Sequence, residues 1–289
     1  MGNLRAVLLV LFASSMALIC SVHATCQDST VFYWGADRGR YIGSDTVELM
    51  LNKSGGTGIK SNVFYMYGSI SFSIKLPSGN SAGTVATFYL SSYGDTHDEI
   101  DYEFLGNVTN EPYTIHTNIY TQGYGKREIQ FKPWFDPTDG YHTYTIFWNF
   151  YEVVWIVDGK PIRVYRKHQG YDYPDAQPMK AYASFWNADD WATQKGRVKT
   201  DWSLAPFKAM VQNYKDDACK CTQNDQSCVD RCSVKNENNW WTKDKYQKLS
   251  PTQKEEMDRI RANYMIYDFC ADPKRFNGTV PQECSLAQY

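Results

Sequence analysis

Three carboxylate side chains stand at alternate positions in the segment 97–107, where single apolar residues separate Glu99, Asp101 and Glu103. In an extended strand alternate side chains point to the same face, so the three acids would share one surface. Neighbouring negative charges disfavour each other's ionised form, which makes stability a poor reason for the arrangement. Carboxyl groups that serve as acid, base and nucleophile are what glycosidic cleavage requires, and we interpret the segment as a catalytic strand.

The separation of the two glutamates decides the stereochemical course of such a reaction. Retention through a covalent intermediate needs carboxyl groups about 5–5.5 Å apart, whereas inversion needs about 6.5–9.5 Å. The Cα atoms of Glu99 and Glu103 should lie roughly 13 Å apart, and side chains that lean toward each other leave about 6 Å. This value permits retention and does not say which glutamate is the nucleophile. Asp101 lies between them and can hydrogen-bond to one glutamate and influence which is protonated.

Two other interpretations of the acidic strand are a solvated surface and a calcium site. Dedicated calcium sites commonly draw their ligands from a loop with a glycine at its turn, so we expect no metal and no cofactor. The chain of 289 residues has a formal net charge of −2 without long runs of one sign, which argues against nucleic acid or an anionic membrane as partner. Aromatic residues make up 16% of the chain, and their rings suit both a β core and stacking on sugars.

The catalytic strand needs a sheet to hold it, and the sequence supplies short apolar-alternating segments separated by turns. An Asp158-Gly159 pair marks a hairpin turn between two of them. Many strands without intervening helices predict an all-β fold, a two-sheet antiparallel β-sandwich of the jelly-roll, concanavalin-like type. The expected strands are 46–51, 70–76, 84–91, 99–105, 113–120, 128–132, 141–150, 153–157, 162–166, 179–186 and 207–214.

The chain divides into three predicted parts: a signal peptide (1–24), the sandwich (25–214) and a C-terminal extension (215–289). Arg5, an apolar stretch over 6–20 and small residues before a cut after Ala24 are typical of a secretory signal, with a retained signal anchor as the alternative. No other segment holds 18 apolar residues in a row, so we expect a secreted protein without a membrane span.

The extension should contain one helix. Ser250, Pro251 and Gln253 form a helix start with a capping box. An apolar stripe at helical spacing then follows, formed by Met257, Ile260, Tyr264 and Tyr267. Six of the eight cysteines also lie here, which in a secreted chain predicts a disulfide-stapled subdomain. A zinc site formed by Cys219, Cys221, Cys228 and Cys232 is the alternative, disfavoured by the C-x-C spacing and the oxidising compartment. Cys26 is left without an assigned partner.

The segment 97–107 resembles the active-site signature of the plant xyloglucan endotransglucosylase/hydrolases in glycoside hydrolase family 16. Other blocks resemble the family in the same order along nearly the whole mature chain. They are 77–84, 116–118, 126–128, 134–137, 186–193, 199–202, 264–268 and 274–276. Two departures are Tyr102, where the family more often has Phe, and Gln194-Lys195 in place of Arg-Gly, which bears on the sugar preference.

The resemblance implies that Glu99 is the nucleophile, Glu103 the general acid/base, and Asp101 the residue that tunes Glu99. It implies a monomer in the cell wall that transfers segments between a xyloglucan donor and a xyloglucan or oligosaccharide acceptor. The short segment 122–126, without the longer loop of hydrolytic members, favours transfer. A predominantly hydrolytic endo-β-glucanase and a non-catalytic glucan-binding lectin of the wall are the alternatives.

Residues around the acids are candidates for holding the sugars. His116 and Asn118 lie two apart on a neighbouring strand and can face one cleft, and the indoles of Trp186 and Trp191 suit stacking. The full candidate set is His116, Thr117, Asn118, Lys126, Arg127, Glu128, Trp186, Asn187, Asp190, Trp191, Gly196 and Arg275. Ordinary structural roles are the alternative for each, and for Gly196 a plain turn glycine.

Modification sites complete the expectations. Family spacing implies the bridges Cys219–Cys228 and Cys270–Cys284, and leaves Cys221 and Cys232 for a third bridge. Sequons for N-glycosylation occur at Asn52, Asn107 and Asn277.

Overall fold

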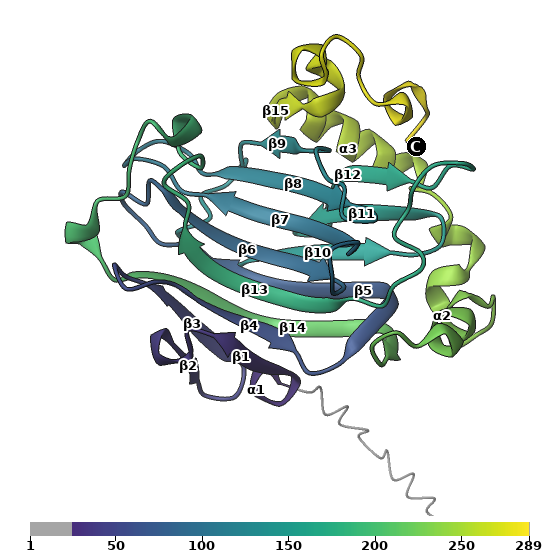
Figure 1. Ribbon diagram of the computed structural model, residues 1–289, viewed down its shortest axis with the longest axis horizontal. Coiled ribbons are helices and arrows are strands. Elements are labelled where there is room, and N and C mark those ends of the chain that lie inside the picture. The colour runs from purple at the N-terminus through teal and green to yellow at the C-terminus, as the bar shows by residue number, and fades with distance from the viewer. Residues whose placement is uncertain (1–24, 289) are drawn as a thin grey trace, which may run out of the picture.

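Two antiparallel sheets form a sandwich in a computed structural model that describes residues 25–288 (Figure 1). The predicted signal segment 1–24 lies outside the described residues. The eight-stranded sheet has the spatial order β1 (Thr30–Trp34), β4 (Thr57–Ser61), β13 (Lys180–Asn187), β6 (Thr84–Ser91), β7 (Glu99–Leu105), β8 (Thr114–Tyr120), β9 (Ile129–Phe131) and β15 (Met265–Asp268). The seven-stranded sheet has the order β12 (Lys160–Arg166), β11 (Glu152–Val157), β10 (His142–Trp148), β5 (Phe64–Lys75), β14 (Phe207–Cys221), β3 (Thr46–Leu51) and β2 (Gly39–Ile42).

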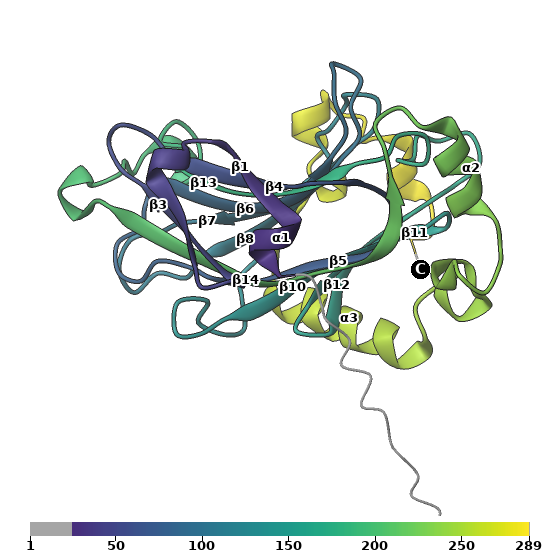
Figure 2. The ribbon, with the colours of Figure 1, turned by 90° about the horizontal axis from the view of Figure 1, so that it is seen from below.

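The predicted fold class is confirmed. Figure 2 shows the two sheets as stacked layers, with helix α3 (Pro251–Tyr264) against the outer side of the seven-stranded sheet. Two shorter helices, α1 (Cys26–Ser29) and α2 (Gln226–Ser233), lie near the start of the sandwich and after its last long strand. Because β7 is fifth of eight strands in its sheet, its exposed face lies near the middle of the molecule and is flanked on both sides.

The apolar residues between the acids of β7 point into the core, as the alternation predicts. Ile100, Tyr102 and Phe104 are fully buried between the sheets. The hydroxyl of Tyr102 donates a hydrogen bond of 3.0 Å to the carbonyl oxygen of Ile156 in the opposite sheet. From that sheet, the indole Nε1 of Trp155 donates at 2.8 Å to the carbonyl oxygen of Asp101. These bonds fix the distance between β7 and the second sheet.

The hydroxyl of Tyr102 gives a testable contribution to stability. Replacing Tyr102 with Phe removes the inter-sheet hydrogen bond while keeping the ring in place. We expect the free energy of unfolding to fall by about 1 kcal/mol, the net value of one buried hydrogen bond. Urea unfolding followed by tryptophan fluorescence measures this change, and a variant at least as stable as the parent would show that the bond contributes nothing.

Several strands match their predicted bounds at both ends: β3, β6 and β7. Four short strands were not predicted: β1, β2, β4 and β15. Strand β14 continues beyond its predicted end at Tyr214 to Cys221. The added part of β14 reads Lys-Asp-Asp-Ala-Cys-Lys-Cys and pairs with the first half of β5. Its charged side chains are exposed or partly exposed, so the sequence of this part lacks the apolar alternation of a typical strand.

The C-terminal helix begins as predicted. The Ser250 hydroxyl accepts from the Gln253 backbone N–H, and the Gln253 side chain accepts in return from the Ser250 N–H. Met257 and Ile260 are fully buried. The predicted stripe is wrong at its end, because the helix stops at Tyr264 and Tyr267 lies in β15, which pairs with β9.

The disulfide pairing differs from the expectation. The bridges are Cys219–Cys232, Cys221–Cys228 and Cys270–Cys284. Only Cys270–Cys284 was predicted correctly; the expected Cys219–Cys228 and Cys221–Cys232 pairs are wrong. Cys219 and Cys221 share one face of β14, and Cys228 and Cys232 share one face of α2. Since the chain doubles back between strand and helix, the inner cysteines meet each other and the outer ones meet each other. Cys26 is a buried free thiol.

Candidate active site

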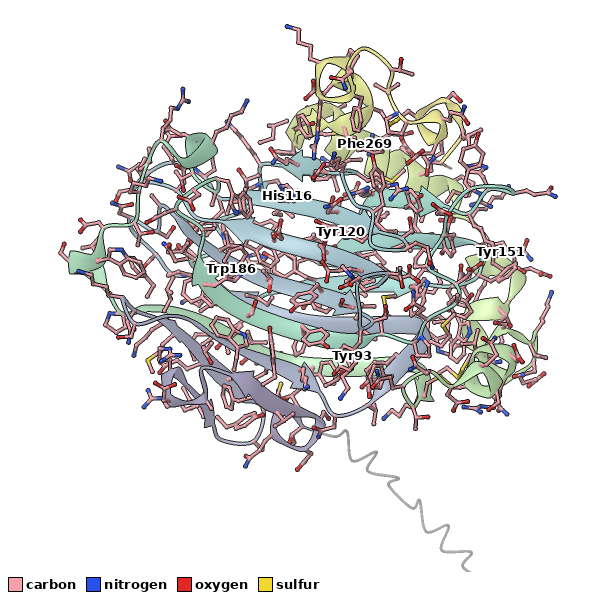
Figure 3. The ribbon with its side chains drawn as sticks, in the orientation of Figure 1. Tyr93, His116, Tyr120, Tyr151, Trp186 and Phe269 are labelled. Carbon is pink, nitrogen blue, oxygen red and sulfur yellow. A yellow bond between two sulfur atoms is a disulfide. The ribbon has the colours of Figure 1, made fainter. Side chains whose placement is uncertain are left out.

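The exposed face of β7 forms the floor of a cleft of about 400 Å³ that contains all three acids. Aromatic side chains form much of its wall: Tyr33, Trp34, Tyr89, Tyr120 and Trp186. In Figure 3, Tyr120, His116 and Trp186 surround the middle of the eight-stranded sheet, while Tyr93 lies toward its β13 side. A cleft with acids at its floor and rings on its walls suits a chain of sugar units.

Strand register sets the neighbour of each acid. On β8, Glu103 lies opposite His116, Asp101 opposite Asn118, and Glu99 opposite Tyr120. On β6, the corresponding residues are Thr87, Tyr89 and Ser91. The side chains next to the three acids are therefore placed by ladder pairing of three adjacent strands, which is a rigid support.

Asp101 is the most deeply buried of the three acids. Its pKa is raised well above the ordinary value, mainly by burial and then by the negative charges of Glu99 and Glu103. Its side chain hydrogen-bonds to Glu99, and the charge on Glu99 favours the protonated form of Asp101 as donor. Asp101 thus lies between the two glutamates, as strand alternation predicts, and hydrogen-bonds to Glu99.

The two glutamates have different surroundings. Burial raises the pKa of Glu99, while hydrogen bonding with Ser91, the charge of His97 and the bond from Asp101 all act to lower it. The pKa of Glu103 is raised to about 8 by burial and by the charges of Glu99 and Glu128, with no opposing contribution. Glu99 is therefore the better carboxylate and Glu103 the better acid, an asymmetry that the residue spacing could not provide.

His116 is neutral and lies beside Glu103. Burial lowers the pKa of His116 to about 4. Its Nε2 atom lies 3.5 Å from a carboxylate oxygen of Glu103. The ring of Trp191 lies 6.2 Å from the His116 ring and 6.2 Å from that of Trp186, so these three predicted residues come together at one end of the cleft.

Two predicted binding residues on β8 and in the following loop have structural contacts. Thr117 points into the core, on the other face from His116 and Asn118, and its hydroxyl donates to the carbonyl of Ile129. Arg127 is buried, forms a 2.7 Å ion pair with Glu283, and its backbone N–H donates to the side chain of Asn118. The structure does not bring Thr117 into the cleft, because strand alternation turns it away.

Three charged candidates come from the loop between β8 and β9 and from the C-terminal extension. Glu128 and Arg275 form an ion pair of 2.6 Å that joins the segment before β9 to the C-terminal extension. Lys126 is exposed, and its ammonium lies 6.0 Å from the ring centre of Tyr124.

The predicted residues at the end of β13 and just after it shape the loop that follows this strand. The side-chain amide of Asn187 donates to the Gly83 carbonyl and the Thr200 hydroxyl. Asp190 is fully exposed and lies 3.5 Å from Lys199. Gly196 has φ +80°, and a Cβ there would lie 2.1 Å from the Asp190 carbonyl oxygen, so Gly196 fits the turn-glycine alternative.

The three sequon asparagines lie at the surface. Asn52 and Asn107 are partly exposed and Asn277 is exposed. The side-chain amide of Asn107 donates to the carbonyl of Pro112 at 3.1 Å. Their glycosylation stays a prediction.

Sequence reasoning missed most of the cleft wall. Tyr89 and Ser91 alternate with apolar residues in a strand whose bounds were predicted, so the signal was present, but only strand order shows that β6 neighbours β7. Tyr33 and Trp34 come from β1, more than sixty residues before the acids, and no local pattern connects them to the site.

Two sequence profiles of known families match the chain. The sequence profile "Glycosyl hydrolases family 16" matches residues 27–204, and the profile "Xyloglucan endo-transglycosylase (XET) C-terminus" matches residues 235–284. A probable xyloglucan endotransglucosylase/hydrolase, protein 23 of Arabidopsis thaliana, is 45% identical over 284 residues, 97% of each chain. The chain belongs to the xyloglucan endotransglucosylase/hydrolase family.

Other relatives extend this result. Xyloglucan endotransglucosylase protein 7 of Diospyros kaki is 45% identical over 88% of this family member and 94% of its own length. Among solved structures, a prokaryotic β-1,3-1,4-glucanase from a mouse hindgut metagenome shares the fold, with a TM-score of 0.53 at 21% identity over 66% of this chain and 92% of its own. The Bacillus licheniformis β-glucanase aligns with a TM-score of 0.50 at 25% identity, over 63% of this chain and 83% of its own.

None of the helices in residues 25–288 of this family member has the length and apolar character needed to cross a bilayer.

Proposed function

We propose that this member of the family cuts the β-1,4-glucan backbone of xyloglucan and transfers the released segment to another xyloglucan chain, with retention of configuration. Glu99 is the nucleophile, Glu103 the general acid/base, and Asp101 the residue that tunes Glu99. The observation that carries the proposal is the asymmetry on one strand face: Glu99 accepts stabilising hydrogen bonds, whereas the pKa of Glu103 is raised to about 8. The names of the relatives support xyloglucan as the substrate.

The reaction takes two steps in this proposal. Glu103 donates its proton to the glycosidic oxygen while the carboxylate of Glu99 attacks the anomeric carbon, so the glycosyl-enzyme forms and the leaving half departs. Glu103, now a carboxylate, removes a proton from an acceptor hydroxyl, which attacks the same carbon and releases Glu99. Asp101 weakens its hydrogen bond to Glu99 as the ester forms and strengthens it again as the carboxylate returns.

The substrate chain would lie across the strands, so that rings on both sides of β7 contact it. Tyr33 and Trp34 from β1 lie on one side, and Tyr120 from β8 with the Glu128–Arg275 pair before β9 lies on the other. These two sides offer places for a donor and an acceptor, which transfer requires. Water as the second acceptor gives hydrolysis, and the deciding quantity is the occupancy of the acceptor side.

We further propose a secreted monomer that acts in the cell wall without a cofactor and without nucleic acid or membrane as partner. Three disulfides among the described residues suit an oxidising compartment. The three-part division into signal, sandwich and extension, and the sequons, belong to the same proposal.

Incubation with xyloglucan, with and without a labelled xyloglucan oligosaccharide, tests the activity. Incorporation of label into polymer should exceed the release of new reducing ends. A protein that releases reducing ends at the same rate with and without acceptor is instead a hydrolase, and one that only retains glucan without changing its length is a lectin.

The pH dependence follows from the raised pKa of Glu103. The acid form of Glu103 is required for cleavage, so kcat/KM should fall tenfold per pH unit above about pH 8. The acidic limit is set by protonation of Glu99. Initial rates across this range measure the profile, and a rate that holds constant well above this value would show that Glu103 is not the acid.

A further inference from the structure

Glu103, His116 and Gln130 lie in a line across three neighbouring strands. The register pairs Glu103 of β7 with His116 of β8, and His116 with Gln130 of β9. The side-chain nitrogen Nε2 of Gln130 lies 2.9 Å from Nδ1 of His116. On the other side of the ring, Nε2 of His116 lies 3.5 Å from Oε2 of Glu103. The imidazole therefore connects an uncharged amide to the general acid/base.

The contact with Gln130 determines where the imidazole proton sits. With the amide nitrogen of Gln130 toward the ring, Nδ1 of His116 is the acceptor, because an amide nitrogen only donates. A neutral imidazole carries one proton, which is then on Nε2 and directed at Glu103. His116 stays neutral because burial dominates over the charges around it and lowers its pKa to about 4.

The charged groups facing this line come from four elements. Glu99 and Asp101 lie on β7, Glu128 precedes β9, Arg163 reaches from β12, and Arg275 comes from the C-terminal extension. Glu128 raises the pKa of His116, whereas the two arginines lower it. Glu128 is itself paired with Arg275 at 2.6 Å, so its charge is largely compensated and the imidazole remains uncharged.

We propose that Gln130 is a positioning residue that holds His116 as the Nε2–H tautomer, so that His116 donates to Oε2 of Glu103 and leaves Oε1 to carry the catalytic proton. The inference rests on the proposed role of Glu103. During cleavage the proton on Oε1 passes to the leaving glycosidic oxygen, and during transfer a proton from the acceptor hydroxyl returns to Oε1. His116 neither gains nor loses a proton in either step.

This arrangement serves both protonation states of Glu103. An N–H donor can bond to Oε2 of the acid and, more strongly, to Oε2 of the carboxylate. The contact of 3.5 Å is long for a hydrogen bond and is expected to shorten as negative charge develops on Glu103. A charged imidazolium would instead stabilise the carboxylate permanently and weaken the acid.

Nitrogen NMR of the His116 ring tests the tautomer without reference to activity. Long-range proton–nitrogen correlations should show Nδ1 unprotonated and Nε2 protonated, unchanged between about pH 5.5 and 8 because the pKa lies far below. A His116→Gln variant assigns the signal by its disappearance. Protonation of Nδ1, or a ring that titrates within this interval, would overturn the proposal.

Two substitutions at Gln130 test the consequence for catalysis. In Gln130→Glu the carboxylate accepts from Nδ1–H and favours the imidazolium, whose charge lowers the pKa of Glu103. The alkaline limb of kcat should then move to lower pH, and kcat should fall about 10- to 100-fold with KM little changed. In Gln130→Leu the imidazole proton is no longer held on Nε2 of His116. We expect kcat to fall about 10-fold, without a shift of the alkaline limb of its pH profile.

Gln212→Glu is the matched control, because Gln212 lies on β14 in the other sheet, where its Oε1 accepts from the Thr46 hydroxyl. Its kinetics and pH profile should equal those of the parent. A Gln130→Glu enzyme with the parent's pH profile would overturn the proposal. If a Glu103→Gln enzyme kept full activity, the proposed function would fail instead, while the NMR result would still decide the tautomer.

Discussion

Replacing Glu99 with alanine should reduce transfer and hydrolysis of xyloglucan by at least about 10³-fold, because no other carboxylate can form the glycosyl-enzyme. Asp101 cannot take over, since its pKa is raised well above the ordinary range and it is 6% exposed. The alanine leaves space beside the anomeric carbon, and a small anion such as azide can enter it. With an activated donor, azide should restore turnover and give a glycosyl azide of inverted configuration.

The measurement is the rate of label incorporation and of reducing-end release, with Glu111→Ala as the matched control. Glu111 is an exposed acid in the loop between β7 and β8, outside the cleft, so its loss should leave both rates unchanged. Substantial activity in Glu99→Ala, or an azide product of retained configuration, would contradict the assignment of the nucleophile.

Replacing Glu103 with glutamine should slow cleavage of xyloglucan by about 10²- to 10⁴-fold, the usual contribution of a general acid. The loss should be much smaller for the first step with an aryl glycoside, whose leaving group needs no proton. The same substitution should stabilise the folded protein at neutral and alkaline pH, which is the opposite of what loss of a structural side chain does.

The sign of this stability effect follows from the pKa of Glu103. The folded protein binds the proton up to about pH 8, whereas in the unfolded chain the ordinary value of 4.5 applies. Between these values the folded state holds more protons, so rising pH removes stability from the parent, while glutamine does not ionise. Thus the free energy of unfolding of the variant should exceed that of the parent by an amount that grows across this interval and reaches on the order of 4 kcal/mol near pH 8.

Urea unfolding of both proteins between about pH 5 and pH 8 measures this difference. The Glu103→Gln protein could instead be less stable than the parent at pH 8, or exceed the parent's free energy of unfolding by the same amount at pH 5 and pH 8. Either result would mean that Glu103 is not a desolvated acid in the folded state.

The strand β7 was predictable because all of the information that defines it is local. Alternation of acids and apolar residues gives the bounds of β7, its buried face and the shared side of Glu99 and Glu103. The capping box at Ser250 is equally local, and it too was confirmed. Such signals depend on the backbone geometry of a few consecutive residues, so a short segment of sequence is enough to predict them.

Features that depend on strand order were not predictable in the same way. Tyr33 and Trp34 reach the cleft because β1 pairs with β4 and β4 with β13, a topology that no short pattern contains. The disulfides failed for a related reason, since equal spacing suits several pairings until the strand and the helix that carry the cysteines are known. Arg127 looks like a surface residue in the sequence and is buried by the C-terminal extension through Glu283.

The asymmetry between the two glutamates likewise arises from the fold. Ser91 and His97 lower the pKa of Glu99, and Ser91 comes from a neighbouring strand. The resemblance to the family implies the same roles that we propose from the surroundings of the two glutamates.

The central claim is that Glu99, and not Glu103, bonds to the sugar. Incubating the protein with a xyloglucan oligosaccharide donor that carries fluorine at C2 and a good leaving group slows breakdown of the intermediate, which peptide mapping by mass spectrometry can then locate. The account predicts one glycosyl group on the peptide that contains β7, esterified to Glu99. A sugar attached to Glu103, or turnover of the donor with inverted configuration and no adduct, would contradict it.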